Sequence, residues 1–215
     1  MNRPIRSYVL RQGRTTPAQQ RALQELFPEY GLPFTGKLLF PEEIFRRKAP
    51  LVLEIGSGMG ESMAAVAKAH PEADFIAVEV HGPGVGSLLK RIDAEQLANV
   101  RVIRHDAVEV LERMIPDGAL AAIHLFFPDP WPKKRHHKRR LVQPAFAALA
   151  ARKLAPGGTL HAATDWAEYA EQMQSVFSEV LEKADAGFVQ RPVTKFEARG
   201  RRLGNPVQDL VFRRR

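Results

Sequence analysis

Residues 51–60, LVLEIGSGMG, join a short apolar run to a closely spaced set of glycines. The run from 51 to 55 is bounded by Pro50 and Gly56 and is almost entirely apolar, which is typical of a strand buried on both faces. A helix is predicted to begin at Glu61, directly after the glycines. Because glycine permits tight turns and a close approach of the backbone to a ligand, this unit indicates a nucleotide-type ligand at a strand–turn–helix junction.

The rest of the chain alternates between short apolar runs and amphipathic stretches. Strands are predicted at 75–78, 100–103, 120–126, 159–163 and 207–212, and helices at 61–70, 85–97, 108–114, 141–154 and 168–181. Thr16-Pro17 predicts an earlier helix, with a capping hydroxyl and a proline at its first position, and Pro28 is expected to end it. This alternation predicts an α/β fold with a mostly parallel sheet and helices on both faces.

The sequence predicts one main domain. The chain has 215 residues and no cysteine, which excludes a disulfide framework and thiolate chemistry. No run approaches the ~18 apolar residues that a membrane helix needs, and the polar start does not resemble a secretory signal. We therefore expect a cytoplasmic protein with no membrane partner. Segments 1–45, 131–140 and 190–206 are predicted to lie outside the core.

Basic residues are concentrated in three segments. Residues 1–24 hold five arginines and no acid, residues 133–140 read KKRHHKRR, and residues 199–215 hold six arginines against one aspartate. Because the net charge is only +8, the remainder of the chain is acidic. This distribution favours a polyanion binder with a separate pocket of different charge. Basic termini could equally serve solubility, but the internal run repels itself unless a partner neutralises it.

Carboxylates lie at the predicted ends of three strands. Glu54 stands beside the glycine turn, where it suits the ammonium of S-adenosylmethionine better than the pyrophosphate of NAD. Glu79 ends the next strand, at a distance suited to a ribose hydroxyl pair. Asp106 follows the third strand and could accept a hydrogen bond from an adenine amino group, cap the following helix, or do both.

The segment at 125–132, LFFPDPWP, leaves the fourth predicted strand. Its alternating prolines hold the backbone extended and fix the position of Asp129, while Trp131 offers a flat surface to a base. A rigid turn with a buried tryptophan would explain the prolines but not an aspartate in the cleft. Since the basic run follows at once, a phosphate-binding strip is expected beside the reaction centre.

Two later segments are less informative alone. Thr164-Asp165-Trp166 ends the fifth strand, where helix capping and a substrate role are equally good interpretations. Residues 194–200, TKFEARG, would pass for a solvated loop. The histidines show no spacing typical of a metal site, so no metal is expected.

Together these motifs resemble the bacterial tRNA (guanine-N7)-methyltransferases. The resemblance runs from about residue 37 to the C-terminus, and it is most specific in PDPWPKKRHHKRR and TKFE. It implies a Rossmann-like class I methyltransferase fold of seven strands with an antiparallel last strand. It divides the chain into an N-terminal basic extension with a short helix (1–45) and a methyltransferase domain (46–215).

The resemblance and the glycine turn together assign the site residues. Cofactor contacts are expected from Glu54, Gly56, Gly58, Gly60, Glu79, Asp106 and Asp129, with Asp129 also the catalytic residue. Substrate contacts are expected from Lys133, Asp165, Thr194, Lys195, Phe196 and Glu197, and RNA contacts from Arg135, His136, His137, Lys138, Arg139 and Arg140. The implied cofactor is S-adenosyl-L-methionine, and the implied partner is tRNA, with no obligatory protein partner.

Three alternatives stay open on the sequence. The first is a class I methyltransferase that acts on another RNA position, a protein or a small molecule. The second is an NAD-dependent oxidoreductase, because the glycine turn is shared with such enzymes. The third is an RNA-binding protein that keeps the fold without catalysis, and the intact acids argue against it.

Overall fold

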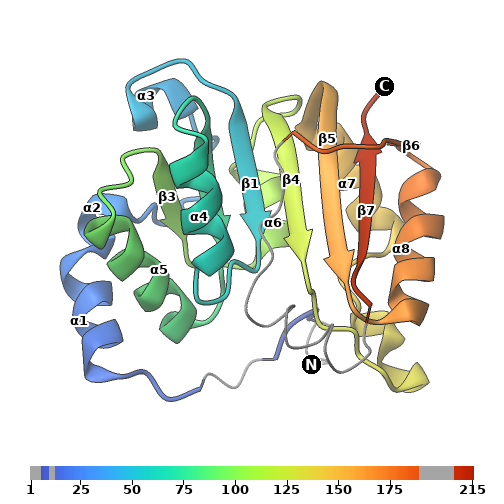
Figure 1. Ribbon diagram of the computed structural model, residues 1–215, viewed down its shortest axis with the longest axis horizontal. Helices are drawn as coiled ribbons and strands as arrows, with labels where there is room; N and C mark the ends of the chain where they lie inside the picture. The colour runs from blue at the N-terminus through green and yellow to red at the C-terminus, as the bar shows by residue number, and fades with distance from the viewer. Residues whose placement is uncertain (1–5, 10–12, 189–205) are drawn as a thin grey trace.

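A seven-stranded sheet runs through the centre of the molecule (Figure 1). The computed structural model describes residues 6–9, 13–188 and 206–215. The strands are β1 (Leu51–Ile55), β2 (Asp74–Val78), β3 (Val100–Ile103), β4 (Leu120–Phe126), β5 (Leu154–Thr164), β6 (Glu182–Lys183) and β7 (Gln208–Arg213). Their order is β3-β2-β1-β4-β5-β7-β6, and β7 is antiparallel to both of its neighbours. The predicted seven-stranded, mostly parallel sheet with an antiparallel last strand is confirmed.

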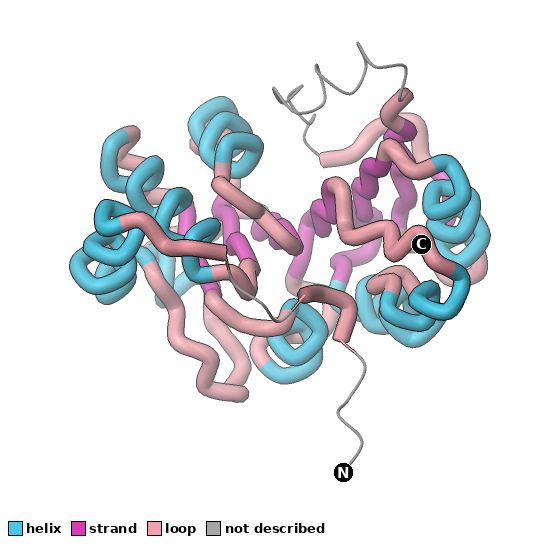
Figure 2. Tube along the Cα trace, turned by 90° about the horizontal axis from the view of Figure 1, so that it is seen from below, coloured by secondary structure: helices cyan, strands magenta, loops and turns pink. Residues whose placement is uncertain are grey.

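Helices cover both faces of the sheet (Figures 1 and 2). They are α1 (Pro17–Glu25), α2 (Phe27–Tyr30), α3 (Pro41–Phe45), α4 (Glu61–Ala69), α5 (Gly82–Ala94), α6 (Ala107–Arg113), the 3₁₀ helix η1 (Lys134–Arg139), α7 (Pro144–Lys153) and α8 (Ala167–Ser178). One core lies between the sheet and α4 and α5, and the other lies between the sheet and α6, α7 and α8.

Strand β1 contributes to both cores. All five of its residues are buried, with Leu53 and Ile55 in one core and Val52 in the other. This arrangement confirms the prediction that the opening apolar run is a strand covered on both faces. The parallel strands β1 to β5 end at one common edge, so the segments that follow them are brought together there.

The N-terminal helices form part of the packed body, although residues 1–45 were expected to lie outside the core. Helix α1 begins with the predicted cap, in which Thr16 and Gln19 exchange side-chain and backbone hydrogen bonds. Ala22 of α1 and Tyr30 of α2 are buried in the core that includes α5. Pro28 does not end a helix as predicted; it lies in the first turn of α2, where its missing N–H costs nothing.

Several element boundaries also differ from the prediction. Strand β5 begins at Leu154, five residues earlier than expected, because Leu154 pairs with Leu120 of β4 before the Pro156–Gly158 irregularity. Helix α5 begins at Gly82 rather than residue 85. Strand β6, which has only two residues, was not predicted.

Candidate cofactor and RNA site

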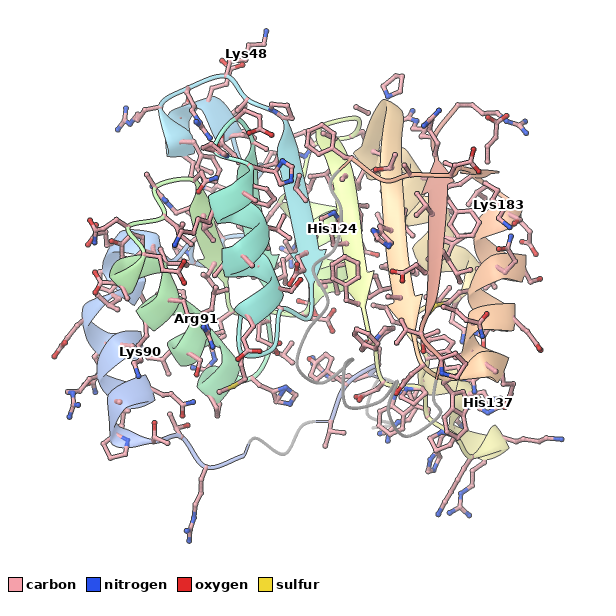
Figure 3. All side chains as sticks on the ribbon, viewed as in Figure 1. Lys48, Lys90, Arg91, His124, His137 and Lys183 are labelled. Atoms are coloured by element: carbon pink, nitrogen blue, oxygen red, sulfur yellow. The ribbon has the colours of Figure 1, made fainter. Side chains whose placement is uncertain are left out.

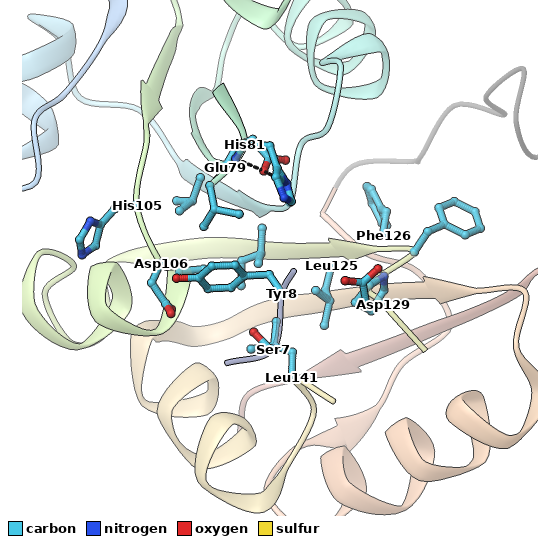
Figure 4. Close-up of a pocket in the computed structure, with 17 residues that line it drawn as sticks. Ser7, Tyr8, Glu79, His81, His105, Asp106, Leu125, Phe126, Asp129 and Leu141 are labelled. Carbon is cyan, nitrogen blue, oxygen red and sulfur yellow. Dashed lines mark hydrogen bonds and ion pairs between the residues drawn. The ribbon is translucent and has the colours of Figure 1, made fainter. Parts of the chain in front are cut away.

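A cavity of about 190 Å³ opens at the edge where the parallel strands end (Figure 4). It is lined by Glu79 after β2, Asp106 after β3 and Asp129 after β4, together with Gly56 of the glycine turn. Three carboxylates that are far apart in the sequence therefore face one cavity, as predicted from the end points of the strands.

The glycine turn adopts a backbone conformation that other residues strongly disfavour. Gly56, Gly58 and Gly60 have φ of 75°, 55° and 77°. A Cβ at Gly60 would lie 2.6 Å from a methyl carbon of Leu88, so α4 and α5 approach each other closely at this point. A Cβ at Gly56 or Gly58 would meet no atom within 4 Å, which leaves open space beside the turn.

Glu79 connects strand β2 to the glycine turn. One of its carboxylate oxygens accepts from the backbone N–H of Gly58 (2.9 Å), and the other accepts from the backbone N–H of His81 (2.8 Å). These two bonds hold the carboxylate at the cavity wall. Each oxygen retains a lone pair that can accept from a ligand hydroxyl.

Glu54 is buried in β1, next to the glycine turn, and one of its oxygens has no hydrogen bond. Its side-chain oxygen Oε2 has no partner among the described residues, and the nearest imidazole nitrogen, Nδ1 of His124, lies 4.0 Å away. Burial, helped by the nearby carboxylate of Glu79, raises the pKa of Glu54 to about 8. Burial also lowers the pKa of His124 to about 3, so this imidazole is neutral and does not balance the carboxylate.

Asp106 caps α6 and also faces the cavity. Its Oδ1 accepts from the backbone N–H of Val108 (2.9 Å), and its Oδ2 lies 3.8 Å from the guanidinium of Arg6. Both interpretations of this residue from the sequence are therefore compatible with its position, because Oδ1 makes the cap, Oδ2 is not used by it, and the residue lines the cavity.

The loop after β4 holds Asp129 in a strained, well-anchored segment. Phe127 and Trp131 have φ of 52° and 44°, a left-handed conformation rare for aromatic residues. The N–H of Phe127 donates to the carbonyl of Ala163 (2.7 Å), which ties the start of the loop to the end of β5. Partial burial raises the pKa of Asp129, against a smaller lowering effect from His81.

Trp131 is engaged by the protein on more than one side. Its indole N–H donates to the carbonyl of Ser7 (3.0 Å), the guanidinium of Arg139 lies 4.5 Å from its ring centroid, and His136 contacts it edge-on. The expected flat surface for a base is therefore partly used to fix the loop.

The basic run forms η1, beside the N-terminal end of α8, where Figure 3 labels His137. Lys133, Lys134, Arg135 and Lys138 are exposed, whereas His136, His137 and Arg139 are half-buried. Arg140 is only 3% exposed and its side chain points into the protein, so the prediction that it contacts RNA directly does not fit its position.

Comparisons with known proteins identify the family. The family model described as "Putative methyltransferase" matches residues 48–210. The chain is 54% identical to a tRNA (guanine-N(7)-)-methyltransferase of Nitrosospira multiformis, over all of this chain and 96% of that protein. It is 58% identical to one of Thiobacillus denitrificans, over 98% of this chain and 96% of that protein. The chain belongs to the tRNA (guanine-N(7)-)-methyltransferase family.

Solved structures with low sequence identity share the fold. The 16S rRNA methyltransferase KamB has a TM-score of 0.59 at 17% identity, covering 80% of this chain and 91% of its own. The aminoglycoside resistance methyltransferase NpmB1 has a TM-score of 0.57 at 16% identity, covering 81% of this chain and 91% of its own. The class I methyltransferase fold predicted from the sequence is confirmed.

S-adenosylmethionine, the cofactor of this family, fits the observed cavity. Ile55 and Gly56 line the cavity, and Glu54, which directly precedes them, holds a buried carboxylate oxygen without a partner for an ammonium. The open side of Gly56 and Gly58 leaves room for a ligand. Glu79 and Asp106 present acceptors to the same space. A pyrophosphate would instead meet several carboxylates at once, which disfavours the NAD alternative.

The predicted substrate residues lie in different surroundings. Lys133 is exposed at the start of the basic run, and Asp165 is half-buried directly after β5. Residues 194–197 lie outside the described residues. Within the described part of the chain, no group of three or more metal-ligating side chains gathers, and no helix is long and apolar enough to cross a membrane.

The sequence did not single out the two N-terminal residues that line the cavity. Ser7 and Tyr8 line the cavity, and Figure 4 shows the Tyr8 ring between Asp106 and Leu125. A lone tyrosine in a basic, polar stretch was the available signal, but nothing in its spacing connects it to residues more than 90 positions away.

Proposed function

We propose that this protein transfers a methyl group from S-adenosylmethionine to N7 of a guanine in the variable loop of tRNA, in the cytoplasm. The observation that carries the proposal is the position of Asp129. It lines the same cavity as Glu79 and Asp106, and the exposed basic run begins four residues later. A methyl donor and an RNA guanine can therefore be held on either side of one carboxylate.

The cavity and the residues directly beside it have separate roles in holding the cofactor. Glu54 would pair with the ammonium, Glu79 with the ribose hydroxyls and Asp106 with the adenine amino group. Gly56, Gly58 and Gly60 would let the backbone approach the cofactor closely, with φ values that only glycine adopts readily. When bound, S-adenosylmethionine supplies an electrophilic methyl group on a sulfonium.

Asp129 orients the guanine rather than acting as a base. N7 of guanine has a free lone pair and no proton, so no deprotonation is needed before it attacks a methyl group. Asp129 can accept from N1–H or the exocyclic amine and hold the ring in line with the methyl group. Its negative charge also favours the positive charge that moves onto the purine during transfer.

The remaining substrate residues surround this centre. Lys133, Asp165 and the segment 194–197 are proposed to contact the guanosine and its neighbours. Arg135 to Arg139 are proposed to bind phosphates, with no protein partner required. Because α1 and α2 pack on the fold, we propose that the basic extension 1–45 acts as part of the same body as the methyltransferase domain 46–215.

Methyl transfer to bulk tRNA tests the proposal directly. The purified protein is incubated with labelled S-adenosylmethionine and unmodified tRNA, and the RNA is digested to nucleosides. Label in 7-methylguanosine is expected. Label in another nucleoside would overturn the assigned position, and absence of label in all nucleosides, with S-adenosylhomocysteine still bound, would overturn the assigned substrate.

A further inference from the structure

Arg140 is the last cation of the basic run, and it alone in that run is fully buried. Its side chain is 1% exposed, whereas Lys134 and Arg135 extend into solvent. A buried guanidinium is costly unless its N–H groups find acceptors, so its partners show what it holds together.

The three nitrogens of the guanidinium reach three separate elements. Nε donates to the carbonyl of Pro130 (2.8 Å), which directly follows Asp129. Nη1 donates to Oε1 of Gln172 on α8 (2.7 Å), and Nη2 donates to Nε2 of His137 on η1 (3.0 Å). One side chain thus joins the loop after β4, the basic 3₁₀ helix and α8.

Neighbouring groups complete this arrangement. The guanidinium carbon lies 4.9 Å from the ring centroid of Tyr169, and Nη1 lies 3.5 Å from a carboxylate oxygen of Glu168. Because arginine cannot accept a hydrogen bond, Nε2 of His137 is the acceptor and its proton sits on Nδ1, 3.5 Å from Glu168. The network therefore supplies at least one acceptor to each guanidinium nitrogen, together with a counter-charge.

We infer that Arg140 is a positioning residue that holds the loop bearing Asp129 in place relative to the basic run. This inference rests on the proposed function. When RNA phosphates bind the exposed cations of η1, the hydrogen bonds of the buried guanidinium keep the backbone at Pro130 in a fixed position relative to η1. Arg140 itself touches no RNA. Its contribution appears in the rate of methyl transfer rather than in the affinity for tRNA.

Arg140→Lys is the main test, because lysine keeps the charge but one ammonium cannot span three diverging acceptors. We expect kcat at saturating tRNA to fall about 10–100-fold, as for a misplaced catalytic group. The Kd for tRNA, its salt dependence and the Kd for S-adenosylhomocysteine are expected to stay within about threefold, since phosphate contacts are unchanged. Gln172→Ala, which removes one acceptor and leaves the charge, is expected to lower kcat less, in the same direction.

A substitution of an exposed arginine in the same run serves as the control that distinguishes a positioning role from direct contact with RNA. Arg135→Gln, in the exposed part of the same run, is expected to weaken tRNA binding and lower the salt slope by about 0.7–0.9. If Arg140→Lys reproduced this behaviour with kcat unchanged, direct RNA binding would replace the inferred role.

Loop fluorescence supplies a readout independent of methyl transfer. Trp131 and Trp166 are the two tryptophans of the chain, so Trp166→Phe leaves Trp131 as a reporter of the loop. Arg140→Lys in this background is expected to increase acrylamide quenching of Trp131, with a cooperative melt retained. Unchanged quenching together with unchanged kcat would reduce Arg140 to a purely structural residue. If wild-type protein methylated no tRNA, the proposed function would fail, while the quenching result would still decide whether Arg140 holds the loop.

Discussion

Glu54 links cofactor binding to pH through a single side chain. Its pKa of about 8 makes it mostly neutral at pH 7, whereas an ammonium favours the ionised carboxylate. We therefore expect binding of S-adenosylhomocysteine, which carries the same ammonium, to release a proton at pH 7. The affinity should rise up to ~10-fold per pH unit below the pKa. Calorimetry in buffers of different ionisation enthalpy measures the number of protons released on binding. An affinity for S-adenosylhomocysteine that does not change from pH 6.5 to 8.5 would contradict the pairing of Glu54 with the ammonium.

The stability of Glu54→Gln provides the matching control. Because the folded-state pKa of Glu54 is raised from 4.5 to about 8, its contribution to stability is present below pH 4.5 and is lost as pH rises through 8. Glutamine does not titrate, so the free energy of unfolding of the variant, measured by urea melts, should rise relative to that of the wild type between pH 5 and 8.5. A difference independent of pH would mean that Glu54 is already ionised in the folded protein.

A substitution at Asp129 can test whether its negative charge or only its shape contributes to the rate of methyl transfer. Asp129→Asn keeps the size and an acceptor oxygen but removes the charge, so the rate at saturating tRNA is expected to fall about 10–1000-fold. Binding of S-adenosylhomocysteine, measured in parallel, checks that the cavity is intact. A variant with the full rate would leave Asp129 with an orienting role and remove the electrostatic part of the mechanism.

Helix η1 is the element expected to set the salt dependence of tRNA binding. Neutralising Lys134, Arg135 and Lys138 together, each to Gln, removes exposed cations without touching the buried Arg140. The slope of log K against log salt should decrease by about 2–3, with affinity for S-adenosylhomocysteine retained. Filter binding over a range of salt concentrations measures this slope. An unchanged slope would show that the RNA phosphates do not bind at η1.

Helix α1 is expected to stabilise the whole fold through one close approach to α5. A Cβ at Gly86 would lie 2.6 Å from the carbonyl oxygen of Gln19, so Gly86→Ala must displace α1. We expect a loss of about 1–3 kcal/mol in the free energy of unfolding. Gly13→Ala, where a Cβ meets nothing within 4 Å, is the control and should change it by less than about 0.5 kcal/mol. Equal urea midpoints for Gly86→Ala and Gly13→Ala would show that α1 does not unfold cooperatively with the rest of the fold.

At the scale of the whole molecule, the sequence predicted what short-range patterns determine. The bounds of β1, β3 and β4 match the prediction because each is a short, mainly apolar run with polar residues, glycine or proline close to its ends. The shared position of Glu79 and Asp129 was predictable too, since parallel strands end at one edge.

Long-range contacts account for the features that were not predicted. Ser7 reaches the cavity through a hydrogen bond from Trp131, 124 positions away. Arg140 looks like its basic neighbours in the sequence, and only the packing of η1 against α8 turns it inward. Likewise, the early start of β5 depends on pairing with Leu120, which no local pattern encodes.

The cavity joins the two halves of the sheet, so ligand binding should stabilise the molecule as a unit. Glu79 and Asp106 follow strands on one side of β1, and Asp129 follows β4 on the other. At 100 times its Kd, S-adenosylhomocysteine is expected to add about 2.7 kcal/mol to the free energy of unfolding. For a chain of this size that raises Tm by roughly 5–11 °C in a single transition. NADH at the same concentration should leave Tm unchanged, because its pyrophosphate would face these carboxylates. A shift with NADH alone would reverse the cofactor assignment, whereas two separate transitions with S-adenosylhomocysteine would show that the halves of the sheet unfold independently.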